Sequence, residues 1–172
     1  KEAVNPEALQ KAAEKTLERY PYMAVTLGKD GFETARTPFS VREEKGTPCA
    51  PLDLKKGGFL LRILWYGKRI SVERVHALAD GAGGLAFLKT LLYCYLTALG
   101  AEINPEGKLL LPGETPQSGE YEDSFLKYYD GRKAPVQKMP PAFKIKGEPL
   151  PEGGRNVLHG VIGVEGLKKA AR

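Results

Sequence analysis

One short stretch of the sequence combines a histidine, an aspartate and a glycine: His76-Ala-Leu-Ala-Asp80-Gly81. Imidazole takes up and releases a proton near neutral pH, which makes histidine the commonest general base. A histidine and an aspartate four residues apart also occur by chance. The flanking residues therefore decide how strongly this motif indicates a functional site. A predicted strand ends at the histidine, glycines follow the aspartate, and an apolar helix comes next. Together these flanks limit the directions in which the imidazole can point.

The elements that must position this stretch are a β-hairpin before it and a helix after it. Residues 59–66 are a nearly continuous apolar run, which is typical of a central strand covered on both faces. A turn leads into a second strand over residues 69–76, where alternation places Arg74 and His76 on one face. Leucines and tyrosines then recur at helical spacing over residues 85–99.

The residues before this hairpin predict one more helix and one more hairpin. Asn5-Pro6-Glu7 is a helix-start pattern, and the helix should cover residues 6–19 and stop before Pro21. Residues 22–27 and 32–37 predict a hairpin around a Gly-rich turn. Residues 38–58 are rich in proline and charge, and we expect loop there, with at most a short strand at 39–42.

The C-terminal part predicts fewer regular elements. The candidates are a short strand at 109–111, a short helix within 120–129, a further strand at 157–162 and a helix that begins at 164. Residues 132–154 contain five prolines, which favours an extended linker. We therefore expect a domain at residues 1–131, a Pro/Gly-rich linker or crossover at 132–155, and the start of a truncated second domain at 156–172.

Composition excludes several classes of protein. With 172 residues, 42% hydrophobic and 27% charged, the chain can bury a core and is not disordered in composition. The net charge of +5 is spread along the chain in mixed-sign order, which predicts no nucleic-acid partner. The run at 85–99 is too short to span a membrane and is interrupted by Lys89, so we expect no membrane span and a cytoplasmic protein.

Several other candidate residues have simpler structural interpretations. Asp80 precedes a helix and is a natural N-cap. Gly81, Gly83 and Gly84 lack the Lys-Ser/Thr ending of a phosphate loop, so we expect them to permit a tight turn and close backbone approach. His159 has no partner pattern and is predicted to be an ordinary strand residue. The two cysteines, Cys49 and Cys94, lack the spacing of a metal site or a disulfide framework, and we expect Cys94 in the core.

The stretch Val75-His76-Ala-Leu-Ala-Asp80-Gly81 resembles the His-His-x-x-x-Asp-Gly motif of the coenzyme-A-dependent acyltransferase superfamily, which includes chloramphenicol acetyltransferases, alcohol acetyltransferases and condensation domains of peptide synthetases. The order of elements over residues 6–99 is also similar to the N-terminal half of a two-domain member. One departure is Val75, which stands where the family has its first histidine. The second histidine, which is the catalytic one in the family, matches His76.

The resemblance implies an α+β fold, a chloramphenicol acetyltransferase-like two-layer sandwich with helices packed on a mixed β-sheet. His76 would be the general base that deprotonates a small alcohol or amine, which then attacks the thioester of acyl-CoA. Acyl-CoA would be a cosubstrate, with no metal and no permanently bound cofactor. Asp80 and Gly81 would support the loop, Asp80 through a salt bridge to an arginine; Arg19, Arg62 and Arg74 are the candidates.

The resemblance further implies that the site lies between this chain and a C-terminal half of the same protein, so that the isolated fragment would be inactive. Two other functions stay open. One is a condensation-type domain that takes acyl groups from carrier proteins, and the other is a catalytically silent homologue that acts as a binding module. A homotrimer of the chloramphenicol acetyltransferase kind is less expected, because the motif lies near the end of the chain in those enzymes and before the midpoint here.

Overall fold

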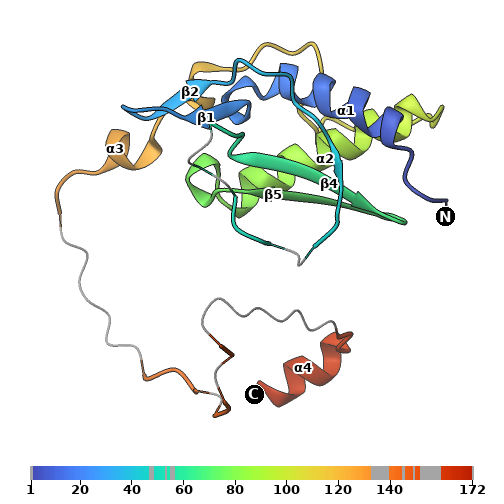
Figure 1. Ribbon diagram of the computed structural model, residues 1–172. Coiled ribbons are helices and arrows are strands. Elements are labelled where there is room, and N and C mark those ends of the chain that lie inside the picture. Colours follow the sequence, from blue (N-terminus) through green and yellow to red (C-terminus); the bar gives the residue numbers. More distant parts are fainter. Residues whose placement is uncertain are drawn as a thin grey trace. The chain divides into compact units, whose positions relative to one another are not determined.

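The computed structural model of the chain describes residues 2–46, 49–52, 54, 57–132, 140–144, 146–148, 150–151 and 160–171. The chain divides into two compact units, Lys1–Gly131 and Arg132–Arg172. The first unit holds the described strands, helices α1 to α3 and the His76 stretch (Figure 1). The second unit holds α4 (Val164–Ala170), which lies within the helix predicted from residue 164.

Helix α1 (Pro6–Arg19) begins and ends where the sequence predicts. The Asn5 side chain accepts a hydrogen bond from the backbone N–H of Ala8 at 3.0 Å, which satisfies one of the free donors of the first turn. Pro6 suits the first turn because its fixed φ is helical and its missing N–H is not needed there. The apolar stripe of the helix, which includes Leu9 and Ala13, is buried.

The strands form two small sheets. β1 (Val25–Leu27) and β2 (Phe32–Thr34) pair antiparallel as the predicted first hairpin, with β1 shortened because Pro21–Met23 form a 3-10 turn. The second sheet has the order β3-β4-β5. In it β3 (Arg42–Glu43) runs parallel and β5 (Arg69–Arg74) antiparallel to β4 (Leu61–Tyr66).

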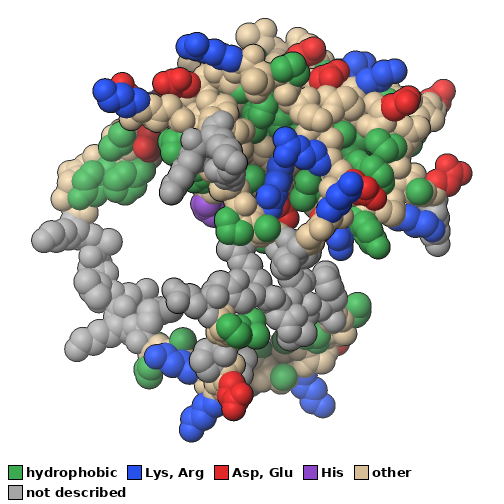
Figure 2. Space-filling view, viewed as in Figure 1, with side chains coloured by type: hydrophobic (Ala, Val, Ile, Leu, Met, Phe, Trp, Pro, Cys, Tyr) green, Lys and Arg blue, Asp and Glu red, His purple; other side chains and the backbone are tan. Residues whose placement is uncertain are grey.

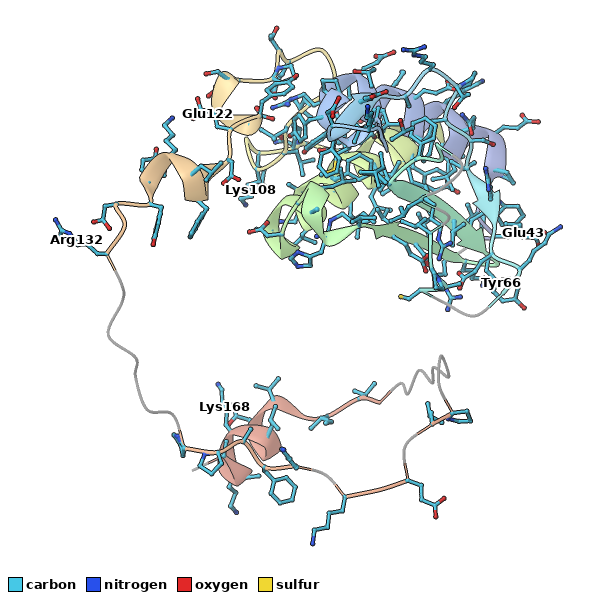
Figure 3. The ribbon with its side chains drawn as sticks, turned by 60° about the vertical axis from the view of Figure 1, so that its left-hand side comes forward. Glu43, Tyr66, Lys108, Glu122, Arg132 and Lys168 are labelled. Carbon is cyan, nitrogen blue, oxygen red and sulfur yellow. The ribbon has the colours of Figure 1, made fainter. Side chains whose placement is uncertain are left out.

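Strand β4 is central in this sheet, as its apolar run predicts. Glu43 of β3 and Tyr66 of β4 lie near the same end of the sheet (Figure 3), in agreement with the pairing of Glu43 with Trp65. Leu61 and Leu64 are both buried, although alternation places them on opposite faces. A strand buried on both faces explains why its sequence does not alternate with polar residues.

Helices α1 and α2 (Gly81–Ala98) pack over one face of the β4–β5 ladder (Figure 1). Leu61 and Ile63 of β4 share a core with Phe87 and Leu91 of α2, and each of these four side chains is at most 1% exposed. Burial of such a side chain contributes about 2 kcal/mol. The fold is α+β, as predicted, with one antiparallel and one mixed sheet.

Some of the predicted elements differ in the structure. Residues 109–111 are not a strand; the carbonyl of Leu110 instead accepts a hydrogen bond from the Thr90 hydroxyl at 2.8 Å. A 3-10 turn at Ser118–Glu120 and α3 (Ser124–Tyr128) occupy the region of the predicted helix at 120–129. Of the strand predicted at 157–162, residues 157–159 lie outside the described residues and residues 160–162 are not in a strand.

The predicted linker at 132–155 is described only in part, and the division into a domain, a linker and the start of a second domain stays a prediction. His159 likewise lies outside the described residues. Within the described ranges, no helix has both the length and the apolar composition needed to cross a membrane.

An ion pair between the buried Arg19 and the partly buried Glu120 ties the segment after α2 back to α1. The Arg19 guanidinium donates to both carboxylate oxygens of Glu120, at 2.8 and 2.9 Å, and its side chain is only 2% exposed. The Tyr22 hydroxyl donates to the same carboxylate at 2.8 Å, and burial raises the pKa of Tyr22, which keeps this group a donor. The hydrogen bonds from Arg19 lower the pKa of Glu120 to about 2.

Removal of this carboxylate should destabilise the first unit. Glu120→Ala removes the two close carboxylate contacts of the buried Arg19 guanidinium and leaves it the longer ion pair with Glu114, at 3.8 Å from Nε. We expect a loss of about 3 kcal/mol in the free energy of unfolding, measured by urea denaturation. Glu106→Ala is the matched control, because Glu106 pairs with Lys108 on the surface and its loss should change stability by less than about 0.5 kcal/mol. Equal effects of the two substitutions would contradict this assignment.

The same pair predicts how stability depends on acid pH. The pKa of Glu120 is lower in the folded protein than in the unfolded chain, so its stabilisation is present above the unfolded value near 4.3 and is lost as pH falls toward about 2. Between pH 5 and pH 2 the stability of Glu120→Gln should therefore fall less steeply than that of the wild type. Urea midpoints measured across this range give the two slopes, and parallel slopes would be the contrary result.

Candidate functional site

The candidate general base, His76, lies in a tight turn between β5 and α2. The ladder with β4 continues one residue past the strand, since the Val75 N–H donates to the Leu60 carbonyl at 2.8 Å. A 3-10 turn then covers His76–Leu78, closed by a hydrogen bond from the Leu78 N–H to the Val75 carbonyl at 3.1 Å. The strand thus ends two residues before the histidine, whereas the sequence predicted a strand up to His76 itself.

The orientation of this turn exposes the imidazole. Leu78 and Ala79 are partly buried and pack against the main core, whereas His76 and Ala77 are exposed. Leu78 and Ala79 anchor the turn to the core, and the half that carries His76 faces outward. His76 therefore lies on a fixed support with its side chain accessible, which is the arrangement that a base acting on an incoming substrate requires.

Asp80 is the N-cap of α2, in agreement with its structural interpretation. Its Oδ1 accepts a hydrogen bond from the Gly83 N–H at 2.8 Å, and its backbone is extended. The helix starts at Gly81, four residues earlier than the sequence predicted, because Gly81–Gly84 are helical once the cap satisfies the first turn. Among the described residues, no ion pair joins the Asp80 carboxylate to an arginine.

The three candidate arginines have different partners. Arg19 binds Glu120, and Arg62 binds Glu73, its cross-strand neighbour on β5, and the carbonyl of Ala50. Arg74 alone reaches Asp80, and its Nη2 donates to the backbone carbonyl of Asp80 rather than to the carboxylate. The arginine that supports the loop is therefore Arg74, but through the main chain.

Gly81, within the motif, and Gly84, three residues after it, have different surroundings. At Gly84 a Cβ atom would lie 2.6 Å from Cζ and Nη2 of Arg74, so no side chain fits while the guanidinium lies there. At Gly81 a Cβ would meet nothing within 4 Å. The expected close approach therefore occurs at Gly84, and it brings in a side chain of β5.

The other side chains that could be reactive have structural roles or lie on the open surface. Cys94 is buried in the core, as predicted, and burial raises the pKa of its thiol, which disfavours the reactive thiolate. Cys49 is exposed, and its N–H donates to Glu73 at 2.7 Å. The described residues contain no cluster of histidine, cysteine or carboxylate side chains able to hold a metal ion.

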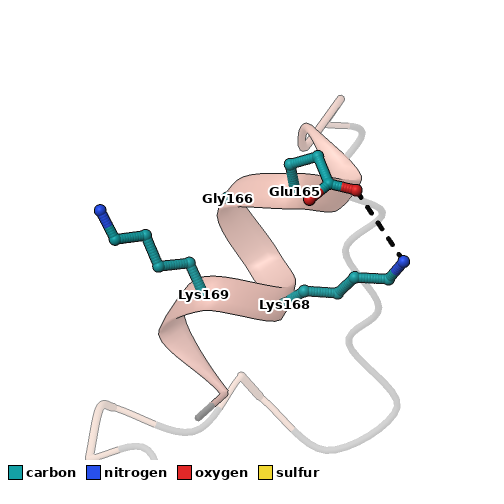
Figure 4. Close-up of a pocket in the computed structure, with 4 residues that line it drawn as sticks. All are labelled: Glu165, Gly166, Lys168 and Lys169. Atoms are coloured by element: carbon teal, nitrogen blue, oxygen red, sulfur yellow. Dashed lines mark ion pairs between the residues drawn. The ribbon is translucent and has the colours of Figure 1, made fainter.

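Two hollows on the surface of the described residues are lined by residues outside the His76 turn. One lies beside α4 and is lined by exposed residues of that short helix, with a 3.9 Å ion pair between Glu165 and Lys168 (Figure 4). Another lies between α1 and α2, lined by residues such as Lys15 and Thr97. The hydrophobic atoms gathered over α3 in Figure 2 belong to exposed side chains that include Phe125 and Leu126.

The capping role of Asp80 can be separated from an ionic one by substitution. Asp80→Ala removes the acceptor for the Gly83 N–H and should cost about 1 kcal/mol of stability. Asp80→Asn keeps a side-chain oxygen there and should stay within about 0.3 kcal/mol of the wild type, because asparagine caps about as well as aspartate. Thermal or urea unfolding measures both; a loss from Asp80→Asn as large as that from Asp80→Ala would indicate that the charge matters instead.

The chain matches no protein-family model, no curated protein and no solved structure.

Proposed function

We propose that this chain is the N-terminal half of an acyltransferase with a chloramphenicol acetyltransferase-like fold, which moves an acyl group from a coenzyme A thioester to a hydroxyl or amine acceptor. The observation that carries the proposal is the exposed imidazole of His76, held in a short turn between the end of β5 and the start of α2. This arrangement supports the motif resemblance, because it offers one accessible base at the end of a sheet.

The chemistry assigned to His76 is general base catalysis. Its neutral imidazole takes the proton of the acceptor O–H or N–H while the acceptor atom attacks the thioester carbonyl carbon. The carbonyl electron pair moves to oxygen and gives a tetrahedral intermediate. The intermediate collapses with cleavage of the C–S bond, and the imidazolium returns its proton to the leaving sulfur. The products are an ester or amide and coenzyme A with a free thiol.

The accessibility of His76 supports a site that is completed by another part of the protein. The start of α2, directly after the His76 turn, also exposes Ala82 and Leu85, and Leu85 is 51% exposed. A reacting thioester needs shelter from water and a donor for its oxyanion. We propose that the C-terminal half of the same protein packs on this surface and supplies both, so that the isolated chain is inactive.

The test is thiol release by the full-length gene product, measured with acyl-CoA donors and a panel of small alcohols and amines. We expect release that requires an acceptor and that falls about 10²- to 10⁴-fold in His76→Ala, since loss of a general base has effects of this size. His159→Ala is the matched control, because His76 and His159 are the two histidines of this sequence. It should retain wild-type release.

The contrary outcomes are distinct. Acceptor-dependent release that survives His76→Ala removes His76 from the mechanism. Failure with every acyl-CoA, combined with activity on acyl groups carried by a phosphopantetheine protein, would replace the proposal with a condensation-type reaction. Failure with both kinds of donor would favour a silent homologue that acts as a binding module.

A further inference from the structure

One side chain links the two ends of the six-residue segment that connects β5 to α2. Arg74 is the last residue of β5 and pairs with Leu61 across the ladder. From there its Nη2 donates to the carbonyl of Asp80, the residue that caps α2. His76 lies between these two points, so the contact joins both ends of the segment that carries the imidazole.

The face on which Arg74 lies explains how it reaches the helix. Residues 70, 72 and 74 share one face of β5, and Ile70 and Val72 pack against the core beneath the helices. Arg74 continues this core-facing row at the point where the sheet ends, so its stem follows the row and its guanidinium meets the first turn of α2. A cation at a core-facing position needs a partner there, and the Asp80 carbonyl supplies one.

Gly84 provides the space for this contact. The guanidinium lies so close to the helix backbone that a Cβ at Gly84 would be 2.6 Å from Cζ and 2.9 Å from Nε. The Gly84 N–H also donates to the Asp80 carbonyl, at 3.0 Å. One carbonyl oxygen thus receives both the first hydrogen bond of the helix and the arginine, and Arg74 Nε is buried there without a hydrogen-bond partner among the described residues.

We propose that Arg74 is a positioning residue for His76. Its guanidinium lies against Gly84 and binds the Asp80 carbonyl, which joins the end of β5 to the start of α2 and holds the turn that presents the imidazole. We call this contact of Arg74 with Asp80 and Gly84 the lock. This assignment rests on the function proposed above. The motif resemblance implied a salt bridge on the Asp80 carboxylate, whereas this lock uses a backbone carbonyl and a glycine outside the His-x-x-x-Asp-Gly pattern. Arg74 does not touch the reacting atoms; it acts through His76.

The lock itself is tested by stability, independently of any activity. Alanine normally stabilises a helix relative to glycine, but Gly84→Ala should lower the melting temperature of the wild type by a few degrees because Cβ displaces the guanidinium. In an Arg74→Ala background no side-chain atom beyond Cβ is left to clash, and the same substitution should raise the melting temperature. Gly81→Ala, in the same turn with nothing within 4 Å of its Cβ, should have the same sign in both backgrounds. An equal effect of Gly84→Ala in both backgrounds would overturn the lock.

The role of the lock is tested by kinetics of the full-length protein. Arg74→Met should lower kcat by about 10- to 100-fold with KM changed less than about twofold, because substrate binding is intact and the base is misplaced. In a His76→Ala background the same substitution should cause no further loss. Arg69→Met, which removes an exposed arginine of the same strand that binds Glu44, should leave kcat unchanged. Circular dichroism and the melting temperature show whether each variant is folded at the assay temperature.

The outcomes separate the two proposals. If His76→Ala abolishes turnover but Arg74→Met keeps the wild-type kcat, the positioning role is wrong and the proposed function stands. An equal loss from Arg74→Met with and without His76 would also overturn positioning, because Arg74 would then act elsewhere. If His76→Ala has no effect, the proposed function fails, and Arg74 has no base to position even where the stability cycle shows the lock.

Discussion

The packing of α1 and α2 on one face of the β4–β5 ladder is the constraint on which the His76 turn depends. Ile70 and Val72 of β5 and Phe87 of α2 contribute to the same core, so the end of the strand and the start of the helix must both lie against it. The chain has only residues 75–80 in which to change from strand to helix. Leu78 and Ala79 pack inward in that segment, and His76 is consequently directed outward.

Polar contacts add to the core packing that positions the His76 turn. Asp80 satisfies an N–H of the first helical turn, and the Asp80 carbonyl receives Arg74. A separate ion pair, between Arg19 and Glu120, holds the segment that follows α2 against α1 and shares no residue with the His76 turn.

Much of the fold could be predicted from local patterns, and the errors have physical causes. Asn5 and Pro6 gave the correct start of α1, and the apolar run of β4 identified a central strand. The start of α2 was predicted four residues late because glycines lower helix propensity, whereas the Asp80 cap stabilises helix there. The His-x-x-x-Asp-Gly spacing located the candidate turn, but its catalytic role stays a prediction.

Contacts that depend on how the elements pack in three dimensions could not be predicted. Nothing local pairs Arg19 with Glu120, which lies 101 residues away. The sequence does indicate that Arg74 needs a partner. An arginine that continues the core-facing row of Ile70 and Val72 must find a hydrogen-bond acceptor near the next element. Which acceptor it uses, and that Gly84 makes room for it, follows only from the packing angle of α2 on the sheet, which the sequence does not display.

The most direct test of the central claim, that His76 faces a bound thioester, is nuclear magnetic resonance of the full-length protein with an unreactive acyl-CoA thioether. The ring signals of His76 can be assigned by comparison with His76→Ala. We predict that they shift progressively and saturate as the analogue is added, with the same affinity as calorimetry gives. Binding that leaves these signals unchanged, or no binding at all, would contradict the account.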